Sequence, residues 1–276
     1  MRLLHSVAEL RAALAGQRET ALVPTMGNLH AGHIALVEQV RDHGRPVVAS
    51  IFVNPLQFGA GEDFQRYPQT LAADCKQLEA AGCDLVFAPD AAEVYPEPQT
   101  FSVRPPLESE LCGAFRPGHF AGVATVVLKL FNLVQPAVAI FGKKDYQQRF
   151  LLEGMVRQFN LPIRILAAET TRAADGLALS SRNGYLSATE REEAPRLYRL
   201  LREAAARIAA GERDFAAVEQ AVSRDLEAHG WKVDYVALRA QATLLPPAPA
   251  TRDLVILAAA HLGRTRLIDN LELRAA

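Results

Sequence analysis

The chain has 276 residues, enough for one large domain or two modest ones, and half of them are hydrophobic, which argues against extensive disorder. Its formal net charge of −1 offers no overall attraction to nucleic acid or to an anionic membrane, so we expect neither partner. Cys75, Cys83 and Cys112 lack metal-ligand spacing and cannot form an even disulfide framework. With no signal peptide or long apolar run expected, these features favour a cytoplasmic protein.

Residues 21–37 begin as an apolar strand, turn at Gly27 and Asn28, and resume with helical spacing. A strand, tight turn and helix in this order form the first half of a βαβ unit, whose helix start presents unpaired N–H groups to an anion. We expect His30 and His33 to project from one face of the first helical turn. A single histidine near a helix start is usually a solvated or capping residue, which is the structural alternative, and a zinc site is a further one, although no Cys, Asp or Glu nearby completes a ligand set.

Strands and helices then alternate along the chain. Buried strands are expected at residues 46–53, 84–88, 137–141 and 163–167, and helices at 70–81, 122–134 and 146–159. This alternation predicts an α/β fold with a doubly wound, Rossmann-like parallel sheet over residues 1–175. Residues 95–106 are rich in proline and are expected to be irregular.

The pattern changes near residue 176. Ser187 to Glu190 form a capping box that opens an alanine-rich helix reaching about residue 210, with a kink or late start at Pro195. A second amphipathic helix is expected at residues 214–229, and strands at 233–238, 253–259 and 264–268. We therefore predict a smaller α+β domain over residues 176–276.

Polar residues follow several of the predicted strands. Asn54 and Gln57 follow the second strand, and Lys143, Lys144 and Asp145 follow a later one. The carboxyl ends of parallel strands share one edge of the sheet, so these residues should converge with the two histidines. Amides suit a small polyol acid, whereas a lysine suits a phosphate and an aspartate suits ribose hydroxyls.

A second polar segment, Leu179-Ser180-Ser181-Arg182, follows the Asp175-Gly176 turn. Two hydroxyls and a guanidinium in succession suit the β- and γ-phosphates of ATP. A polar linker between domains is an equally open alternative.

Five motifs, taken in order, carry a family resemblance: PTMGNLHAGH, SIFVNPLQF, RPGHFAGV, FGKKDYQQ and DGLALSSRNGYL. The chain resembles the pantothenate synthetase (pantoate–β-alanine ligase) family, of the nucleotidylyl-transferase superfamily, over essentially its whole length, down to the LIDN run at residues 267–270. The resemblance implies ATP-dependent condensation of (R)-pantoate with β-alanine through pantoyl adenylate, with release of pyrophosphate and AMP. It also implies Mg²⁺ and a homodimer.

The same resemblance implies roles for individual residues. His33, His30, Lys144 and Arg182 would be catalytic, with His33 as proton donor, and Gln57, Gln148 and Asn54 would bind substrate. ATP would be bound by Met26, Gly27, Asn28, Leu29, His30, Ala31, Gly32, His33, Gly142, Lys143, Lys144, Asp145, Thr171, Leu179, Ser180, Ser181 and Arg182. Metal ligands are not identified by the sequence.

Two positions depart from the family pattern. Lys143 and Cys112 stand where the family usually has Glu, which makes the local charge more positive by three if both face the site. This predicts an active enzyme with altered metal or nucleotide handling. Two alternatives remain at this stage: a nucleotidylyltransferase that leaves the adenylyl group on its product, and a degenerate paralogue that binds nucleotide without turnover.

Overall fold

The computed structural model describes residues 1–59 and 61–276, and these form two compact units. The first unit comprises Met1–Lys143 and Gln147–Glu169, and the second comprises Lys144–Tyr146 and Thr170–Ala276. The tripeptide Lys144–Tyr146 thus belongs to the second unit, although the residues on both sides of it in the sequence belong to the first. The domain division expected between residues 175 and 176 stays a prediction.

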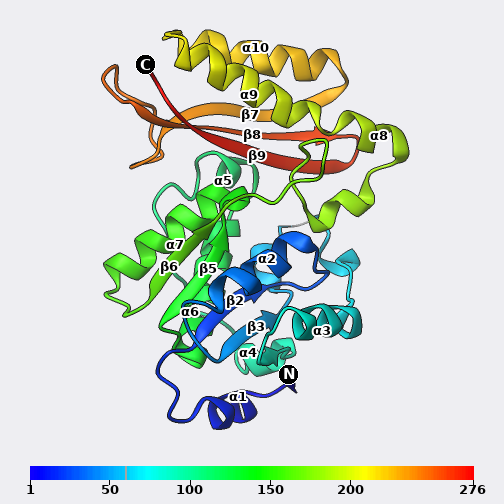
Figure 1. Ribbon diagram of the computed structural model, residues 1–276, viewed down its shortest axis with the longest axis vertical. Helices are drawn as coiled ribbons and strands as arrows, with labels where there is room; N and C mark the ends of the chain where they lie inside the picture. The colour runs from blue at the N-terminus through cyan, green and yellow to red at the C-terminus, as the bar shows by residue number, and fades with distance from the viewer. Residues whose placement is uncertain (60) are drawn as a thin grey trace. The chain divides into compact units, whose positions relative to one another are not determined.

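A six-stranded parallel sheet forms the centre of the first unit (Figure 1). Its strands lie in the order β1-β4-β3-β2-β5-β6, and neighbouring strands are all parallel. The chain moves outward from β2 on one side and from β5 on the other, so the order reverses between them, where ligands bind in such sheets. The predicted fold class is confirmed. The strands are β1 Arg2–Leu4, β2 Ala21–Thr25, β3 Val47–Ile51, β4 Leu85–Phe87, β5 Val138–Gly142 and β6 Arg164–Ala168.

Successive side chains of the central strands enter two different hydrophobic cores, one on each face of the sheet. Leu22 and Val48 pack in one core with α1, α6 and α7, whereas Val23 and Ala49 pack in the other with α2 and α3. Both faces are therefore covered, as apolar parallel strands require. The helices of this layered unit are α1 Val7–Leu14, α2 Ala31–Val40, α3 Leu71–Ala80, α4 Ala91–Val94, α5 Cys112–Phe115, α6 His119–Val134 and α7 Tyr146–Gln158, whose first residue belongs to the second unit.

Two details of this unit were not predicted. The edge strand β1 pairs with β4 over only three residues, too short a stretch to show a period in the sequence. Helix α6 begins at His119 rather than at residue 122, because Gly118 adopts the left-handed conformation at φ 78° and turns the chain into the helix. The expected irregular segment after α4 contains no helix or strand from residue 95 to residue 105.

The second unit is a three-stranded antiparallel sheet with helices, in the order β7-β8-β9. The capping box of Ser187 and Glu190 forms as predicted. Pro195 separates two helices, because proline lacks the N–H that would continue the helix through it. The elements are α8 Ala188–Glu193, α9 Arg196–Ala209, α10 Phe215–Ala228, β7 Trp231–Ala240, β8 Asp253–Leu262 and β9 Thr265–Arg274. Within the described residues, no helix has the length and apolar character needed to span a membrane.

Candidate active site

The turn after β2 is shaped by glycine and by short hydrogen bonds. Gly27 has φ +81°, which a side chain would strain, and a Cβ there would lie 3.2 Å from a carboxylate oxygen of Asp74. Thr25 Oγ1 donates to the carbonyl of Ser50 at 2.6 Å and accepts from the Gly27 N–H at 3.2 Å. The turn is thereby tied to the end of β3.

Asp74, from α3, holds the next two residues of this turn. Its carboxylate accepts from the N–H groups of Asn28 and Leu29, both at 2.9 Å, and from the Thr70 hydroxyl at 3.0 Å. Only 1% of the Asp74 surface is exposed. Backbone N–H groups that would otherwise be buried without a partner are thus satisfied by a charged acceptor, which fixes the chain just before His30.

His30 and His33 form a reciprocal cap at the start of α2. His30 Nδ1 accepts from the Gly32 N–H at 3.1 Å, and His33 Nδ1 accepts from the His30 N–H at 3.3 Å. His30 is the N-cap residue with φ −131°, so it precedes the first helical turn in which we expected it. Because each Nδ1 accepts a backbone N–H, each neutral ring carries its proton on Nε2. The ring centroids lie 4.1 Å apart, which brings two N–H donors to one helix end.

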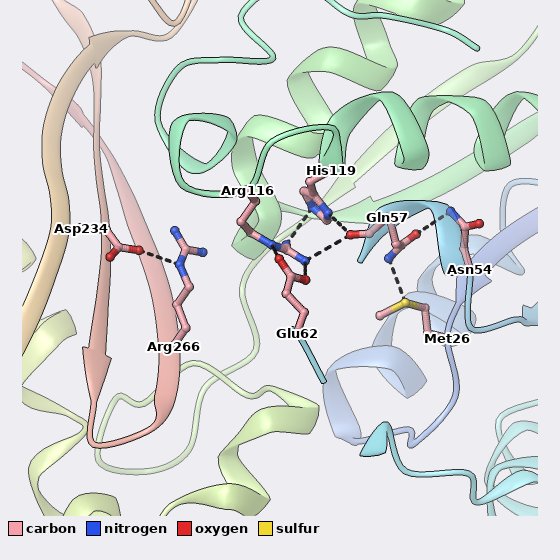
Figure 2. A network of polar contacts seen from close by, with 8 residues as sticks. All are labelled: Met26, Asn54, Gln57, Glu62, Arg116, His119, Asp234 and Arg266. Atoms are coloured by element: carbon pink, nitrogen blue, oxygen red, sulfur yellow. Dashed lines mark hydrogen bonds and ion pairs between the residues drawn. The ribbon is translucent and has the colours of Figure 1, made fainter. Parts of the chain in front are cut away.

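Asn54 and Gln57 lie in a single 3-10 turn after β3, and Figure 2 shows the amides side by side. Asn54 Nδ2 donates to Gln57 Oε1 at 3.2 Å, and Gln57 Nε2 donates to Met26 Sδ at 2.9 Å. The predicted proximity of this amide pair to the βα turn is therefore present.

The amide of Asn54 has no capacity left for a further ligand. Its Oδ1 accepts from the Tyr95 hydroxyl at 2.8 Å and from the Leu56 N–H at 3.3 Å, and its Nδ2 also donates to the Gly122 carbonyl at 3.1 Å. Burial raises the pKa of Tyr95 to about 12, so its hydroxyl remains a donor across the physiological range. With 1% of its surface exposed, Asn54 holds the turn that presents Gln57.

The backbone of Gln57 is held by a cluster that we did not predict from sequence. His119 Nδ1 lies 2.8 Å from the Gln57 carbonyl, and Arg116 Nη1 lies 2.9 Å from His119 Nε2 (Figure 2). Arginine can only donate and a carbonyl can only accept, so His119 carries its proton on Nδ1. Glu62 accepts from Arg116 Nε and Nη2 at 2.9 and 2.6 Å in a bidentate pair.

Gln148, the expected substrate ligand, lies near the start of α7, and Cys112, where the family usually has Glu, is linked to the same helix through Gln147. Gln148 is partly exposed, whereas its neighbour Gln147 is buried and holds the loop before α5 through the carbonyls of Leu107 and Glu110. Gln147 Oε1 also accepts from the Cys112 N–H at 3.0 Å. Cys112 is buried at the beginning of α5.

Lys143 lies in the first unit beside Glu169, with Nζ and Oε1 2.5 Å apart. Glu169 is largely exposed, so this ion pair offsets part of the added positive charge but contributes little to stability.

The remaining predicted residues belong to the second unit. Lys144 Nζ lies 3.5 Å from Asp145 Oδ2. The Thr171 carbonyl accepts from the Leu179 N–H at 2.9 Å, so the two predicted backbone segments pair with each other. Ser180 caps the short helix at Ser181–Tyr185 by accepting from the Arg182 N–H at 3.3 Å. These contacts fix the backbone of the Leu179–Arg182 segment, which carries the two serine hydroxyls and the arginine guanidinium.

Comparison with known proteins identifies the family. A sequence model of the family described as pantoate-beta-alanine ligase matches residues 2–272. The chain belongs to the pantoate-beta-alanine ligase family.

Relatives match the chain over its full length. The pantothenate synthetase of Thiobacillus denitrificans is 63% identical, over 100% of this chain and 98% of that protein. A pantothenate synthetase structure from Thermus thermophilus superimposes with a TM-score of 0.92 at 47% identity, covering 98% of this chain and 99% of that one. The Francisella tularensis ligase, complexed with beta-gamma ATP and beta-alanine, gives 0.84 at 33% identity, covering 98% and 97%.

Membership of the pantoate-beta-alanine ligase family confirms the predicted function, ATP-dependent condensation of pantoate with β-alanine. Within the first unit, the structure brings together the histidine pair, the βα turn and Gln57, as the sequence predicted. It places Lys144, Asp145, Thr171 and the 179–182 segment in the second unit. The roles of the individual residues stay predictions. Asp74 and Glu62 gave no local sequence signal, and Arg116 and His119 lie in the RPGHFAGV motif, which indicated the family but not their contact with Gln57.

Proposed function

We propose that this ligase works in two steps, through pantoyl adenylate, and that its reacting phosphate binds at the start of α2. The observation that carries this proposal is the reciprocal cap of His30 and His33, which places the proton of each neutral ring on Nε2. Two such donors and the positive end of the helix suit the oxygens of an α-phosphate, where charge builds up during reaction.

In the first step, a pantoate carboxylate oxygen attacks the α-phosphorus of ATP. The new P–O bond forms as the bond to the β-phosphate oxygen breaks, so pyrophosphate leaves and pantoyl adenylate remains. Little covalent chemistry is asked of the protein, which contributes position and charge stabilisation. His30 and His33 would donate hydrogen bonds from Nε2 to the phosphate oxygens, and His33 would stabilise the charge on the departing pyrophosphate oxygen by such a bond without giving up its proton.

Gln57 is the proposed pantoate ligand. Its Nε2 can exchange Met26 for a carboxylate oxygen of pantoate, and its Oε1 has a second lone pair that can accept from a pantoate hydroxyl while Asn54 keeps the first. Asn54 would then serve binding through Gln57 rather than by direct contact, since its four hydrogen-bonding positions are already used. Gln148 would supply a second amide.

In the second step, the amine of β-alanine attacks the acyl carbon of the adenylate. The C–N bond forms as the C–O bond to phosphate breaks, AMP leaves, and the amine releases a proton to solvent. Gln57 would also help to place β-alanine. Pantothenate, AMP and the released proton account for every atom of pantoate, β-alanine and the adenylyl group.

We further propose that Lys144, Ser181 and Arg182 bind the phosphates of ATP, which enters as its Mg²⁺ complex. Cationic and hydroxyl donors of this kind suit a triphosphate, and Mg²⁺ commonly binds to substrate phosphates with few protein ligands. Among the described residues, no group of three or more His, Cys, Asp or Glu side chains gathers to hold a metal ion. Met26 to Gly32, Gly142 to Asp145, Thr171 and Leu179 to Ser180 complete the proposed nucleotide contacts.

The test follows pyrophosphate and AMP from ATP and pantoate, with and without β-alanine. We expect slow pyrophosphate release without the amine and AMP formation that requires all three substrates. A dinucleotide-like product without AMP would instead indicate a nucleotidylyltransferase, and ATP binding without pyrophosphate release would indicate a degenerate paralogue. His33→Asn should lower the first step by about a hundredfold.

A cytoplasmic homodimer completes the proposal. The three cysteines are free, as expected in a reducing compartment, and family resemblance favours the dimer. Light scattering of the purified protein at micromolar concentration would give twice the chain mass for a dimer and the chain mass for a monomer.

A further inference from the structure

Strand β9 binds the backbone of Lys144 through Asn270, the last residue of the LIDN run. Asn270 Nδ2 donates to the Lys144 carbonyl at 2.9 Å, and the Asn270 N–H in turn donates to Asp269 Oδ1 at 2.8 Å. Asn270 and Asp269 are 6% and 4% exposed, so both are buried polar residues that require partners. The hydrogen bond thus fixes the Lys144 carbonyl, which is bonded to the Cα that carries the side chain.

An arginine locks this pair of residues in place. Arg172 donates to both Asp269 oxygens, Nη1 to Oδ2 at 2.6 Å and Nη2 to Oδ1 at 2.9 Å. Its guanidinium carbon lies 3.4 Å from the centre of the Tyr198 ring, and Nη1 also donates to the Gly176 carbonyl at 3.1 Å. A bidentate, stacked arginine has little freedom, so the carboxylate that accepts from the Asn270 backbone N–H is rigid.

A second contact fixes the other end of the same tripeptide. The Tyr146 hydroxyl donates to Glu272 Oε1 at 3.0 Å. Residues 270 and 272 are two apart on β9, so their side chains leave the same face of the strand. Lys144 and Tyr146 therefore dock on one face of β9, which explains why this tripeptide belongs to the second unit while residues 143 and 147 belong to the first.

We propose that Asn270, whose backbone is held by Asp269, is a positioning residue for Lys144 in the ligase reaction. This inference rests on the proposed function, in which the Lys144 ammonium binds a phosphate of ATP. A lysine side chain has many rotamers, and its reach to a reacting phosphate depends on where its backbone is fixed. Displacement by about 1 Å can cost about a hundredfold in rate, so a single backbone hydrogen bond has a large effect on turnover.

The test is a double-mutant cycle with Asn270→Ala and Lys144→Ala, measured as kcat/KM for ATP with pantoate and β-alanine saturating. We expect Asn270→Ala alone to lower kcat/KM by about tenfold to a hundredfold, and to have less than about a twofold effect once Lys144 is alanine, because it acts through that side chain. Gln241→Ala is the matched control, since Gln241 Nε2 also donates to a backbone carbonyl, that of Leu254 at 2.8 Å, within the same unit. This control should keep wild-type activity.

Three results would overturn the inference, and each has a different meaning. Full activity of Asn270→Ala, with Lys144→Ala impaired, would leave the proposed role of Lys144 intact and refute the positioning. Losses that multiply in the double variant would assign Asn270 a general structural role. Full activity of Lys144→Ala would refute its proposed role and the inference together. If Asn270→Ala does not fold, Asn270→Thr removes the amide donor with a side chain of similar size that suits a strand, and the same cycle with Lys144→Ala decides the question.

Discussion

The buried carboxylate of Asp74 gives the sharpest prediction about the βα turn. In Asp74→Asn, one oxygen becomes an NH₂ group, so either the Asn28 or the Leu29 N–H faces a donor instead of an acceptor. An unsatisfied buried N–H costs about 1–3 kcal/mol, and the remaining bonds lose the extra strength of a charged acceptor. We therefore expect the free energy of unfolding to fall by about 3 kcal/mol, a large part of a typical total.

The same substitution should impair catalysis, because the turn it loosens leads directly into His30. A small displacement of the two Nε2–H donors should lower kcat by about tenfold to a hundredfold. Urea unfolding followed by circular dichroism measures the first effect, and pyrophosphate release measures the second. Thr70→Val is the matched control, since it removes only the third donor to Asp74 and should cost about 1 kcal/mol. Equal stability and equal activity of Asp74→Asn and Thr70→Val would refute this account of the turn.

Three other predictions address separate positions. Gly122→Ala would place a Cβ 2.1 Å from the Leu56 carbonyl oxygen, so the 3-10 turn that carries Gln57 must move. We expect urea unfolding to show about 2 kcal/mol of destabilisation, and kcat/KM for pantoate to fall roughly tenfold. Unchanged pantoate kinetics would contradict this prediction. Lys143→Glu places a second carboxylate beside that of Glu169, so KM for ATP should rise about threefold to tenfold and depend more steeply on Mg²⁺. If KM for ATP keeps the same dependence on Mg²⁺, the charge at position 143 has no role in ATP binding. Burial raises the pKa of the Cys83 thiol from 9.0 to about 11 in the folded protein. As the pH rises past 9, this thiol therefore ionises only in the unfolded chain, which favours unfolding. The free energy of unfolding should fall by about 2 kcal/mol between about pH 8 and about pH 10.5. That part of the pH dependence, measured by urea unfolding, should vanish in Cys83→Ala.

The architecture of the first unit could be predicted because its signals are local. β3 is an uninterrupted buried run bounded by turn residues, and β2 leads into a glycine turn and a helix. Each of these elements can therefore be recognised from a few consecutive residues. The alternation of such elements then fixes the fold class. The short edge strand β1 could not be found this way, since its three residues form a strand only by pairing with β4.

The support of the site could not be predicted, because it depends on tertiary contacts. Asp74 lies 46 residues from Asn28 and reads in sequence as an ordinary acid on an amphipathic helix. Arg116 and Glu62 are 54 residues apart, and nothing in either segment indicates a shared ion pair. Gln147 and Gln148 are adjacent and identical in type, so only the fold shows which one is buried. A glycine-rich strand-end turn, by contrast, carries its chemistry in its own spacing.

The passage of residues 144–146 through the second unit also limits how this enzyme can be dissected. A cut after Glu169 would leave this tripeptide on the N-terminal fragment, and the C-terminal fragment would lose the partners that β9 binds in Lys144 and Tyr146. Exchange of C-terminal halves between related ligases at that point would likewise combine a tripeptide from one parent with a β9 from the other. A successful chimera must therefore carry the tripeptide together with the strand that holds it.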